Sequence, residues 1–255
     1  MKTLLLALLL AGCHPLLAQP VYINPSNQAH NLEPLVKFAV WSISERAGIN
    51  AYYAGTTDAH CENGKIIVRS YTAEEWEATG IGHRAFAFTA DCGTGFIVVF
   101  SPYYAPQQWL VTHEIAGHAM GYFQHSADQY DVMYPYRVNP LRMLTTNDVN
   151  NIRANSVWPI TRPASLCHIE IDPAKTFIIP SINGLRIVMG YLGVVDGYQT
   201  WVQLYTARTS QSCPNTSLSN GIATLNDIRS MSGNYQSATF EYMGGISWRL
   251  TSLTP

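Results

Sequence analysis

The segment His113–His125 constrains the fold of this chain more than any other part of the sequence. Its 13 residues, HEIAGHAMGYFQH, hold three histidines, a glutamate and two glycines. Imidazole nitrogens bind transition metals well, and three of them on one ion leave a position open for a further ligand. A site of this kind requires a helix that brings His113 and His118 to one side and a turn that returns His125 to them.

The spacing of the first two histidines does not fit a regular α-helix. His113 and His118 are five residues apart, and at 3.6 residues per turn their side chains point about 140° away from each other. A π-bulge absorbs one extra residue and is frequent at functional sites. We therefore predict a wide turn over Glu114–His118, eased by Gly117, and a helix end at Gly121 in a conformation that other residues resist. The histidine nitrogens should then lie within about 3–4 Å of one another, as ligation at about 2 Å requires.

Residues downstream of the third histidine extend the pattern. Ser126 follows that histidine, Asp131–Pro135 (DVMYP) comes shortly afterwards, and Leu144–Ile152 (LTTNDVNNI) predicts a helix capped by a threonine. Together with the histidine segment, these motifs resemble the metzincin zinc proteases, and within them the matrixins. The resemblance covers roughly residues 30–157 and departs from the family pattern at two positions. One extra residue lies between the first two histidines, and another lies before the third.

The resemblance implies an α+β fold in which a mixed sheet carries an active-site helix. It implies one zinc ion held by His113, His118 and His125, and a secreted endopeptidase that cleaves polypeptides. Glu114 would be the general base that takes a proton from the zinc-bound water. In the family a methionine forms an apolar floor under the site, and Met133 stands at that position. The alternative is a homologue that binds zinc without catalysis, because the altered spacing can displace Glu114.

Two tyrosines, Tyr134 and Tyr136, follow this methionine closely. Either could donate a hydrogen bond to a transition-state oxyanion, although packing is the favoured role. The His/Asp pattern that holds a structural zinc and calcium in the matrixins is not recognisable in this sequence, so a calcium site is not evident. Family substrates add as a strand to the sheet edge above the active-site helix, and Gly95–Ser101 is our candidate for that edge.

The N-terminus has the pattern of an export signal. The apolar run Leu4–Ala11 follows a lysine and is too short to span a bilayer. We assign residues 1–18 to a signal peptide and expect a secreted or cell-envelope protein. Its end stays open between two alternatives. Leu10–Cys13 (LAGC) resembles a bacterial lipobox, which would anchor the chain through a lipid on Cys13, and cleavage after Ala18 is the rival.

The cysteine count is consistent with an oxidising compartment. Removal of Cys13 leaves four cysteines, an even number. Two of them precede residue 160 and two follow it, so bridges within each half are favoured. Of the three pairings, we prefer Cys61–Cys92 with Cys167–Cys213.

Hydrophobic patterning divides the chain into two parts. Residues 19–160 are assigned to a catalytic domain, and residues 161–255, with seven short strand-like runs, to a small all-β domain, a sandwich or barrel. Residues 19–31 predict an irregular arm, and residues 160–164 a linker. Four strand-like runs and two helices precede residue 125: a helix from Glu33 to a cap at Gly48, strands at Asn50–Tyr53, Lys65–Ser70, His83–Thr89 and Gly95–Ser101, and a helix from about Pro106.

The charge composition argues against a nucleic-acid partner. The formal net charge is −2, charged residues make up 13% of the chain, and no run of lysine or arginine occurs. The expected partner is a polypeptide substrate, and membrane attachment is expected only through a lipid at Cys13.

Overall fold

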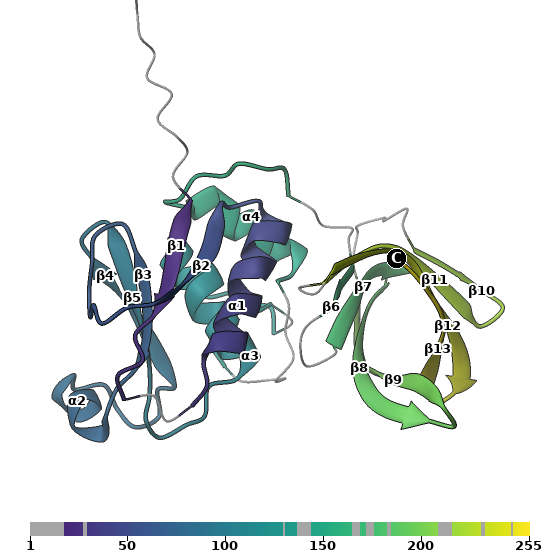
Figure 1. Cartoon of the computed structure of the whole chain (residues 1–255), viewed down its shortest axis with the longest axis horizontal. Coiled ribbons are helices and arrows are strands. Elements are labelled where there is room, and N and C mark those ends of the chain that lie inside the picture. Colours follow the sequence, from purple (N-terminus) through teal and green to yellow (C-terminus); the bar gives the residue numbers. More distant parts are fainter. Residues whose placement is uncertain are drawn as a thin grey trace, which may run out of the picture.

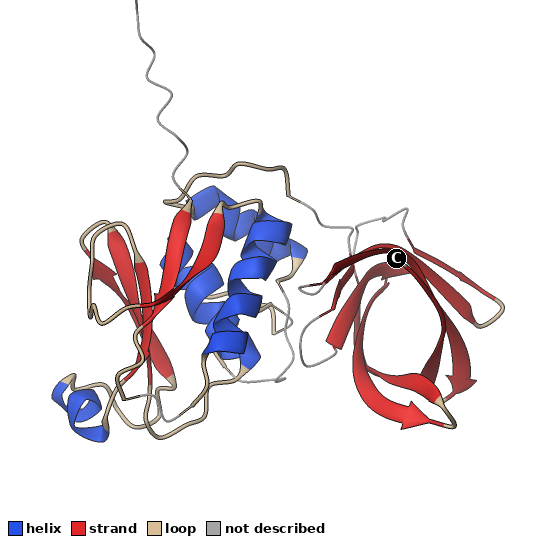
Figure 2. Ribbon diagram, in the orientation of Figure 1, coloured by secondary structure: helices blue, strands red, loops and turns tan. Residues whose placement is uncertain are grey.

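The computed structural model describes an α+β protein with two separate sheets (Figure 1). The predicted signal peptide with Cys13, and the predicted pair Cys167 and Cys213, lie outside the described residues. Within the described part, helices accompany the first sheet only, and the second part consists of strands (Figure 2). The described residues are 18–27, 30–129, 131–136, 144–164, 169–171, 176–182, 185–208, 216–230, 233–245 and 247–255.

The first sheet is mixed and has the strand order β2-β1-β3-β5-β4. Strands β2, β1, β3 and β5 are parallel to one another, and β4 is antiparallel to β5. The coarse fold class therefore agrees with the prediction. The strands are β1 (Gln19–Ile23), β2 (Ala51–Thr56), β3 (Ile66–Ser70), β4 (Ala87–Cys92) and β5 (Gly95–Phe100).

Two sequence-based predictions about this sheet are wrong. Residues 19–31 do not begin with an irregular arm, because β1 pairs with both β2 and β3 and buries Val21 and Ile23. Gly95–Ser101 is not the sheet edge, because β5 lies between β3 and β4. Its continuous apolar sequence reflects this interior position, since strands covered on both faces lose the polar alternation of exposed ones. The edge strand beside β5 is β4.

Three helices pack together on one side of this sheet (Figure 1): α1 (Glu33–Ser42), α3 (Gln108–Thr112) and α4 (Thr146–Asn155). Helix α1 has a proline in its first turn, continues through a π-turn, η1 (Ile43–Ala47), and ends at Gly48 with φ 66°. The predicted cap at Gly48 is therefore confirmed, because a positive φ favours glycine. A short helix not foreseen in the sequence, α2 (Ala73–Ala78), begins with a capping box.

Helix α4 confirms the predicted threonine cap. The side chain of Thr145 accepts the backbone N–H of Asp148 at 3.0 Å, and the Asp148 carboxylate accepts the backbone N–H of Thr145 at 2.8 Å. Such a capping box satisfies two helix-terminal groups reciprocally.

The core lies between the first sheet and its helices. Val36 and Ile43 from the α1 side, Val68 and Val98 from the sheet, and Ile115 from the segment after α3 are fully buried in one cluster. Burial of one such side chain contributes about 1.5–3 kcal/mol. This packing fixes the segment that follows α3 against the sheet.

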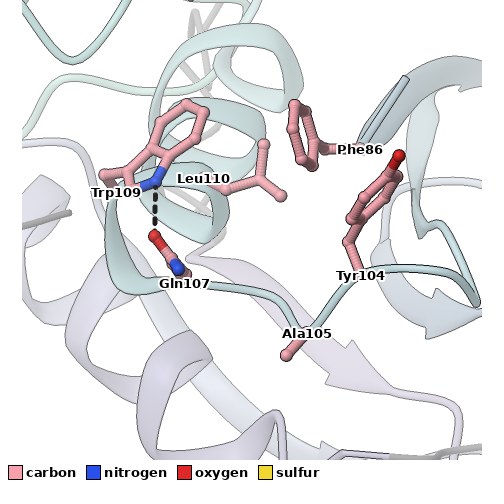
Figure 3. A pocket seen from close by; sticks show the side chains of 6 residues that line it. All are labelled: Phe86, Tyr104, Ala105, Gln107, Trp109 and Leu110. Carbon is pink, nitrogen blue, oxygen red and sulfur yellow. Dashed lines mark hydrogen bonds between the residues drawn. The ribbon is translucent and has the colours of Figure 1, made fainter. Parts of the chain in front are cut away.

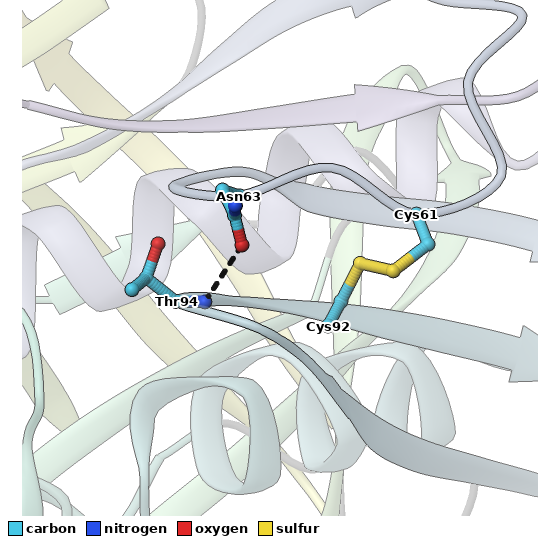
Figure 4. Close-up of a disulfide and its surroundings, with 4 residues drawn as sticks. All are labelled: Cys61, Asn63, Cys92 and Thr94. Atoms are coloured by element: carbon cyan, nitrogen blue, oxygen red, sulfur yellow. Dashed lines mark hydrogen bonds between the residues drawn. A yellow bond between two sulfur atoms is a disulfide. The ribbon is translucent and has the colours of Figure 1, made fainter.

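A disulfide joins Cys61, between β2 and β3, to Cys92 at the end of β4 (Figure 4). This bridge confirms the predicted pairing. Close to it, the backbone N–H of Thr94 donates to Oδ1 of Asn63 at 3.2 Å. Both contacts fasten the β4–β5 hairpin to the loop that precedes β3.

The second sheet contains eight strands in the order β10-β11-β12-β13-β9-β8-β7-β6. Neighbours in this order are antiparallel, and β11 also pairs in parallel with β6, which closes the sheet into a ring. An all-β C-terminal part was expected from the patterning. Its strands are β6 (Ile169–Ile171), β7 (Thr176–Ile182), β8 (Leu185–Val195), β9 (Tyr198–Arg208), β10 (Thr216–Ser219), β11 (Ile222–Ser230), β12 (Gly233–Gly244) and β13 (Ser247–Thr254).

The start of the predicted linker at 160–164 is anchored to the first part of the molecule. Ile160 forms a β-bridge with Ile49. The Arg162 guanidinium donates to the Ser44 carbonyl at 2.6 Å and pairs with the Glu45 carboxylate at 3.3 Å. Among the described helices, none is long and apolar enough to cross a membrane.

Candidate metal centre

The helix that carries the first two histidines changes its winding where the sequence predicts a wide turn. Helix α3 leads into a π-helical turn, η2 (His113–Gly117), and then a 3₁₀ turn, η3 (His118–Met120). The backbone N–H of His118 points at the carbonyl of His113, five residues back, and at that of Glu114. The prediction of a π-bulge is confirmed. The wide turn absorbs the extra residue that would otherwise place the two imidazoles on different faces.

Gly117 gives this turn the room it needs. A Cβ atom at this position would lie 2.0 Å from Sδ and 2.3 Å from Cε of Met133. The Met133 side chain is fully buried and therefore packs directly under the π-turn. A side chain at position 117 would therefore force the buried end of Met133 to move.

Gly121 ends the helical segment, as predicted. Its φ of 104° lies in the left-handed region, which favours glycine. A Cβ atom there would also lie 2.6 Å from the Asn155 carbonyl oxygen at the end of α4. The chain therefore turns tightly against α4 before it reaches His125.

The three histidines converge. One ring nitrogen from each of His113, His118 and His125 lies within 4.8 Å of the others. The ring centroids are 4.8 Å apart for His113 and His118, 5.2 Å for His113 and His125, and 5.1 Å for His118 and His125. This upper limit on the nitrogen–nitrogen distances is compatible with the separation of about 3–4 Å that three nitrogens need to bind one ion. These side chains could hold a metal ion.

Backbone carbonyls orient two of the imidazoles. Nδ1 of His113 donates to the Val132 carbonyl at 2.7 Å, and Nδ1 of His118 donates to the Tyr122 carbonyl at 2.9 Å. A carbonyl only accepts, so Nδ1 carries the proton in both rings. Nε2 is then the unprotonated atom that is free to bind a metal, which is the usual arrangement around ligand histidines.

The electrostatics of the cluster keep its histidines neutral. Burial, together with the neighbouring His118, lowers the pKa of His113 to about 3. Burial also lowers the pKa of His118 and of the more exposed His125. Metal ligation needs unprotonated imidazole, so the folded chain presents the form that binds.

A buried carboxylate fixes the loop that carries the third histidine. Asp131 accepts hydrogen bonds from Ser126 Oγ at 2.6 Å, from Thr145 Oγ1, and from Asn147 Nδ2 at 2.6 Å. Ser126 also donates its backbone N–H to the Met133 carbonyl at 2.8 Å. Because Ser126 adjoins His125, these bonds restrict where the third imidazole can lie.

A second buried carboxylate holds the turn around Met133. Asp148 accepts the backbone N–H groups of Val132 at 2.9 Å and of Met133 at 3.2 Å, in addition to its capping bond with Thr145. Burial and the nearby Asp131 raise the pKa of Asp148 to about 6, against the opposing effect of its backbone N–H donors. Asp148 thus connects α4 to Val132, whose carbonyl orients His113.

Glu114 is buried beside the cluster but does not belong to it. Its carboxylate is absent from the group of converging ligand atoms among the described residues. Oε2 accepts a hydrogen bond from Thr89 Oγ1 on β4 at 2.7 Å. Burial raises the pKa of Glu114 to about 7, and the Thr89 hydroxyl opposes this shift. A carboxylate in this state can exchange a proton near neutral pH.

The two tyrosines of the predicted site lie next to each other after Met133. The rings of Tyr134 and Tyr136 meet edge-on with centroids 5.6 Å apart. Tyr134 is half-buried, whereas 69% of Tyr136 is exposed. The arrangement leaves the Tyr136 ring in solvent.

A small apolar cavity of about 140 Å³ lies at the start of α3, with Trp109 in its wall (Figure 3). Nε1 of Trp109 donates to Oε1 of Gln107 at 3.1 Å, which holds the indole in the wall. The same indole meets the His113 imidazole edge-on, with centroids 6.3 Å apart. The cavity is therefore one aromatic ring away from a candidate metal ligand. Its lining residues are Phe86, Tyr104, Ala105, Gln107, Trp109 and Leu110.

No protein-family model matches this chain, and no curated protein matches it.

The sequence did not single out several residues that build the site. Thr89, which bonds Glu114, stands in an unremarkable strand-like run. Asp131 begins the DVMYP motif and Asp148 lies in the predicted capped helix, but neither pattern indicates that these carboxylates hold the loops around the histidines. The capping pattern was the one signal that pointed to Asp148, because a capping box requires an acceptor at that position.

Replacement of Gly117 by alanine tests the close packing under the π-turn. The added Cβ collides with Met133, so Gly117→Ala should cost about 1–3 kcal/mol of stability and weaken the binding of a divalent metal ion. Urea unfolding and titration with a divalent metal ion measure both effects. Gly82→Ala is the control, because its Cβ would meet no atom within 4 Å.

A second variant distinguishes a steric effect from a general loss of helix. The double variant Gly117→Ala/Met133→Ala should be more stable than the sum of the two single changes, by about 1 kcal/mol or more. If the stability changes of the two single variants simply add in the double variant, Gly117→Ala does not act through a collision with Met133.

The lowered pKa of His113 predicts an acid-sensitive metal-free protein. The unfolded chain takes up a proton near pH 6.5, whereas folded His113 does so only near its pKa of about 3. Its contribution to stability is thus present above pH 6.5 and is lost as the pH falls toward 3. From pH 7 to pH 5 the loss is about 2 kcal/mol. Urea unfolding should show that metal-free wild type loses more free energy of unfolding between pH 7 and pH 5 than His113→Gln does. Equal losses in the two proteins contradict the lowered pKa of His113.

Proposed function

We propose that this protein is a zinc-dependent endopeptidase of the metzincin kind. The observation that supports this most strongly is the convergence of His113, His118 and His125 through a π-turn that also carries Glu114. A π-turn inside a helix lowers stability, so it is expected mainly where it serves a function. Binding of one metal ion by both His113 and His118 would be such a function.

Zinc is the ion we propose for the site. Three neutral imidazoles that leave one position open are a common donor set of catalytic zinc. When bound, zinc lowers the pKa of a water ligand to about 7 and polarises a substrate carbonyl. The lowered pKa values of the three histidines suit this ion, since none has to lose a proton to bind.

Glu114 is the residue we propose as general base. One of its carboxylate oxygens, Oε2, is engaged by Thr89, so Oε1 is the atom that receives the proton of the attacking water. The same carboxyl then passes that proton to the leaving amine. A pKa of about 7, raised by burial, suits a group that both accepts and donates near neutral pH.

The position of β4 supports an extended polypeptide as the substrate. In the described sheet β4 has a partner on one side, β5, and is the edge strand on the other. An extended chain can add to such an edge through backbone hydrogen bonds. We propose that the substrate adds to β4, which replaces the earlier candidate Gly95–Ser101.

The cavity beside His113 supports a preference for an apolar side chain. Its wall includes Phe86, immediately before β4, and Trp109, which contacts His113. A substrate strand on β4 would thus carry a side chain into this cavity while its backbone lies at the metal. We propose that the cavity selects a residue adjoining the cleaved bond.

The proposed mechanism predicts different losses for ligand and base variants. The zinc-loaded protein should cleave an unfolded, carboxymethylated protein, and a chelator should abolish cleavage. Glu114→Gln should keep one zinc per chain but lower kcat/KM about 10²–10⁴-fold. His118→Ala should lose the zinc itself. Metal analysis and peptide mapping by mass spectrometry measure both properties.

Two results would count against this mechanism. Zinc loss from Glu114→Gln equal to that from His118→Ala would make Glu114 a ligand or structural group. A protein that binds one zinc per chain and cuts no member of a broad peptide library would be a metal-binding module without catalysis.

A smaller cavity should change which bonds are cut. Ala105 is exposed and lines the cavity, so Ala105→Phe should fill it without disturbing the core. The preference for leucine over alanine beside the cut should fall about tenfold or more, as expected for a pocket that recognises several methylenes. Ala154→Phe, an exposed change on α4, is the control. An unchanged cleavage pattern in Ala105→Phe removes the cavity from the binding site.

A further inference from the structure

The side chain of Thr89 connects the edge strand to the helix that carries the histidines. Thr89 lies in the middle of β4, in register with Val98 of β5. Its Oγ1 donates to Oε2 of Glu114 at 2.7 Å, between residues 25 apart in sequence. Thr89 is half-buried, and Glu114 is 4% exposed. The bond therefore lies in a sheltered position between strand and helix.

Threonine is well suited to hold a carboxylate in one orientation. Its branched Cβ restricts χ1, so the hydroxyl direction follows from the strand backbone. A glutamate side chain has several rotatable bonds, and a single directed O–H donor fixes the plane of its carboxylate. With Oε2 engaged, Oε1 is the oxygen that stays available; among the described residues it has no hydrogen-bond partner.

The π-turn makes such an external support necessary. Glu114 is the second residue of η2, where the winding departs from a regular α-helix. Its direction is therefore not defined by the helix alone. A bond from β4 supplies a second reference point, and β4 is paired with β5 in the sheet and fastened further by the Cys61–Cys92 bridge.

We propose that Thr89 is a positioning residue that sets the Glu114 carboxylate, with Oε2 held and Oε1 directed to the reacting water. This inference rests on the proposed peptidase function. It also links base and substrate geometrically, because the strand that holds Glu114 is the one to which the substrate would add. A displacement of about 1 Å in a catalytic group costs roughly 10²-fold in rate.

The test compares Thr89→Val, which removes the hydroxyl at nearly constant shape, with Thr89→Ser, which keeps it. In zinc-loaded protein, Thr89→Val should lower kcat about 10- to 100-fold, with KM within about twofold of wild type. Thr89→Ser should stay within about threefold. Thr94→Val, at an exposed threonine of the same hairpin, is the control. All variants should bind one zinc per chain.

A second readout does not depend on turnover. A hydroxamic acid binds zinc as its anion and gives up its O–H proton, which a correctly oriented Glu114 carboxylate beside the metal would accept. Calorimetry with acetohydroxamic acid should therefore show about tenfold weaker binding to zinc-loaded Thr89→Val than to wild type, and near-normal binding to Thr89→Ser.

The two readouts distinguish failure of this inference from failure of the peptidase function. If wild type cuts no peptide but Thr89→Val still binds the hydroxamate more weakly than wild type, the peptidase proposal fails and the role of Thr89 stands. Equal hydroxamate affinities of wild type and Thr89→Val, or a Thr89→Ser variant as impaired as Thr89→Val, overturn the inference.

Discussion

The wide turn between His113 and His118 is the constraint on which the rest of the site depends. Five residues separate these histidines, so a regular helix cannot direct both imidazoles to one ion. The π-turn resolves this conflict and in doing so sets further requirements. Gly117 leaves room for the buried Met133 side chain that lies against it, and Glu114, inside the turn, accepts a hydrogen bond from Thr89 of β4.

The supports of the site form one connected set of hydrogen bonds. The cap of α4 includes Asp148, which holds the backbone of Val132, and the Val132 carbonyl orients His113. Asp131 fastens the loop of the third histidine to the same cap through Thr145. The positions of His113 and His125 are thus linked to a helix that carries neither of them, as is common for groups around metal ligands.

The sequence predicted the features that follow from local patterns. The five-residue spacing of His113 and His118 predicts the π-turn, and the glycine before His125 predicts the end of the helix at Gly121. A threonine ahead of a helical pattern predicts the cap of α4. Long-range contacts were less predictable. The polar, turn-rich sequence of residues 19–31 predicts an arm and not a strand, because the pairing of β1 with β2 and β3 is a tertiary effect that no local pattern indicates. Thr89 could not be recognised, because no local pattern states which strand faces Glu114.

The central claim is that three histidines bind one metal ion, and zinc K-edge X-ray absorption of the zinc-loaded protein tests it most directly. The account predicts one zinc per chain, with three imidazole nitrogens at about 2.0–2.1 Å and a further light-atom ligand. The same spectrum from His118→Ala should lose one imidazole or vanish with the metal. A wild-type spectrum with fewer than three imidazoles, or one that His118→Ala leaves unchanged, would contradict the account.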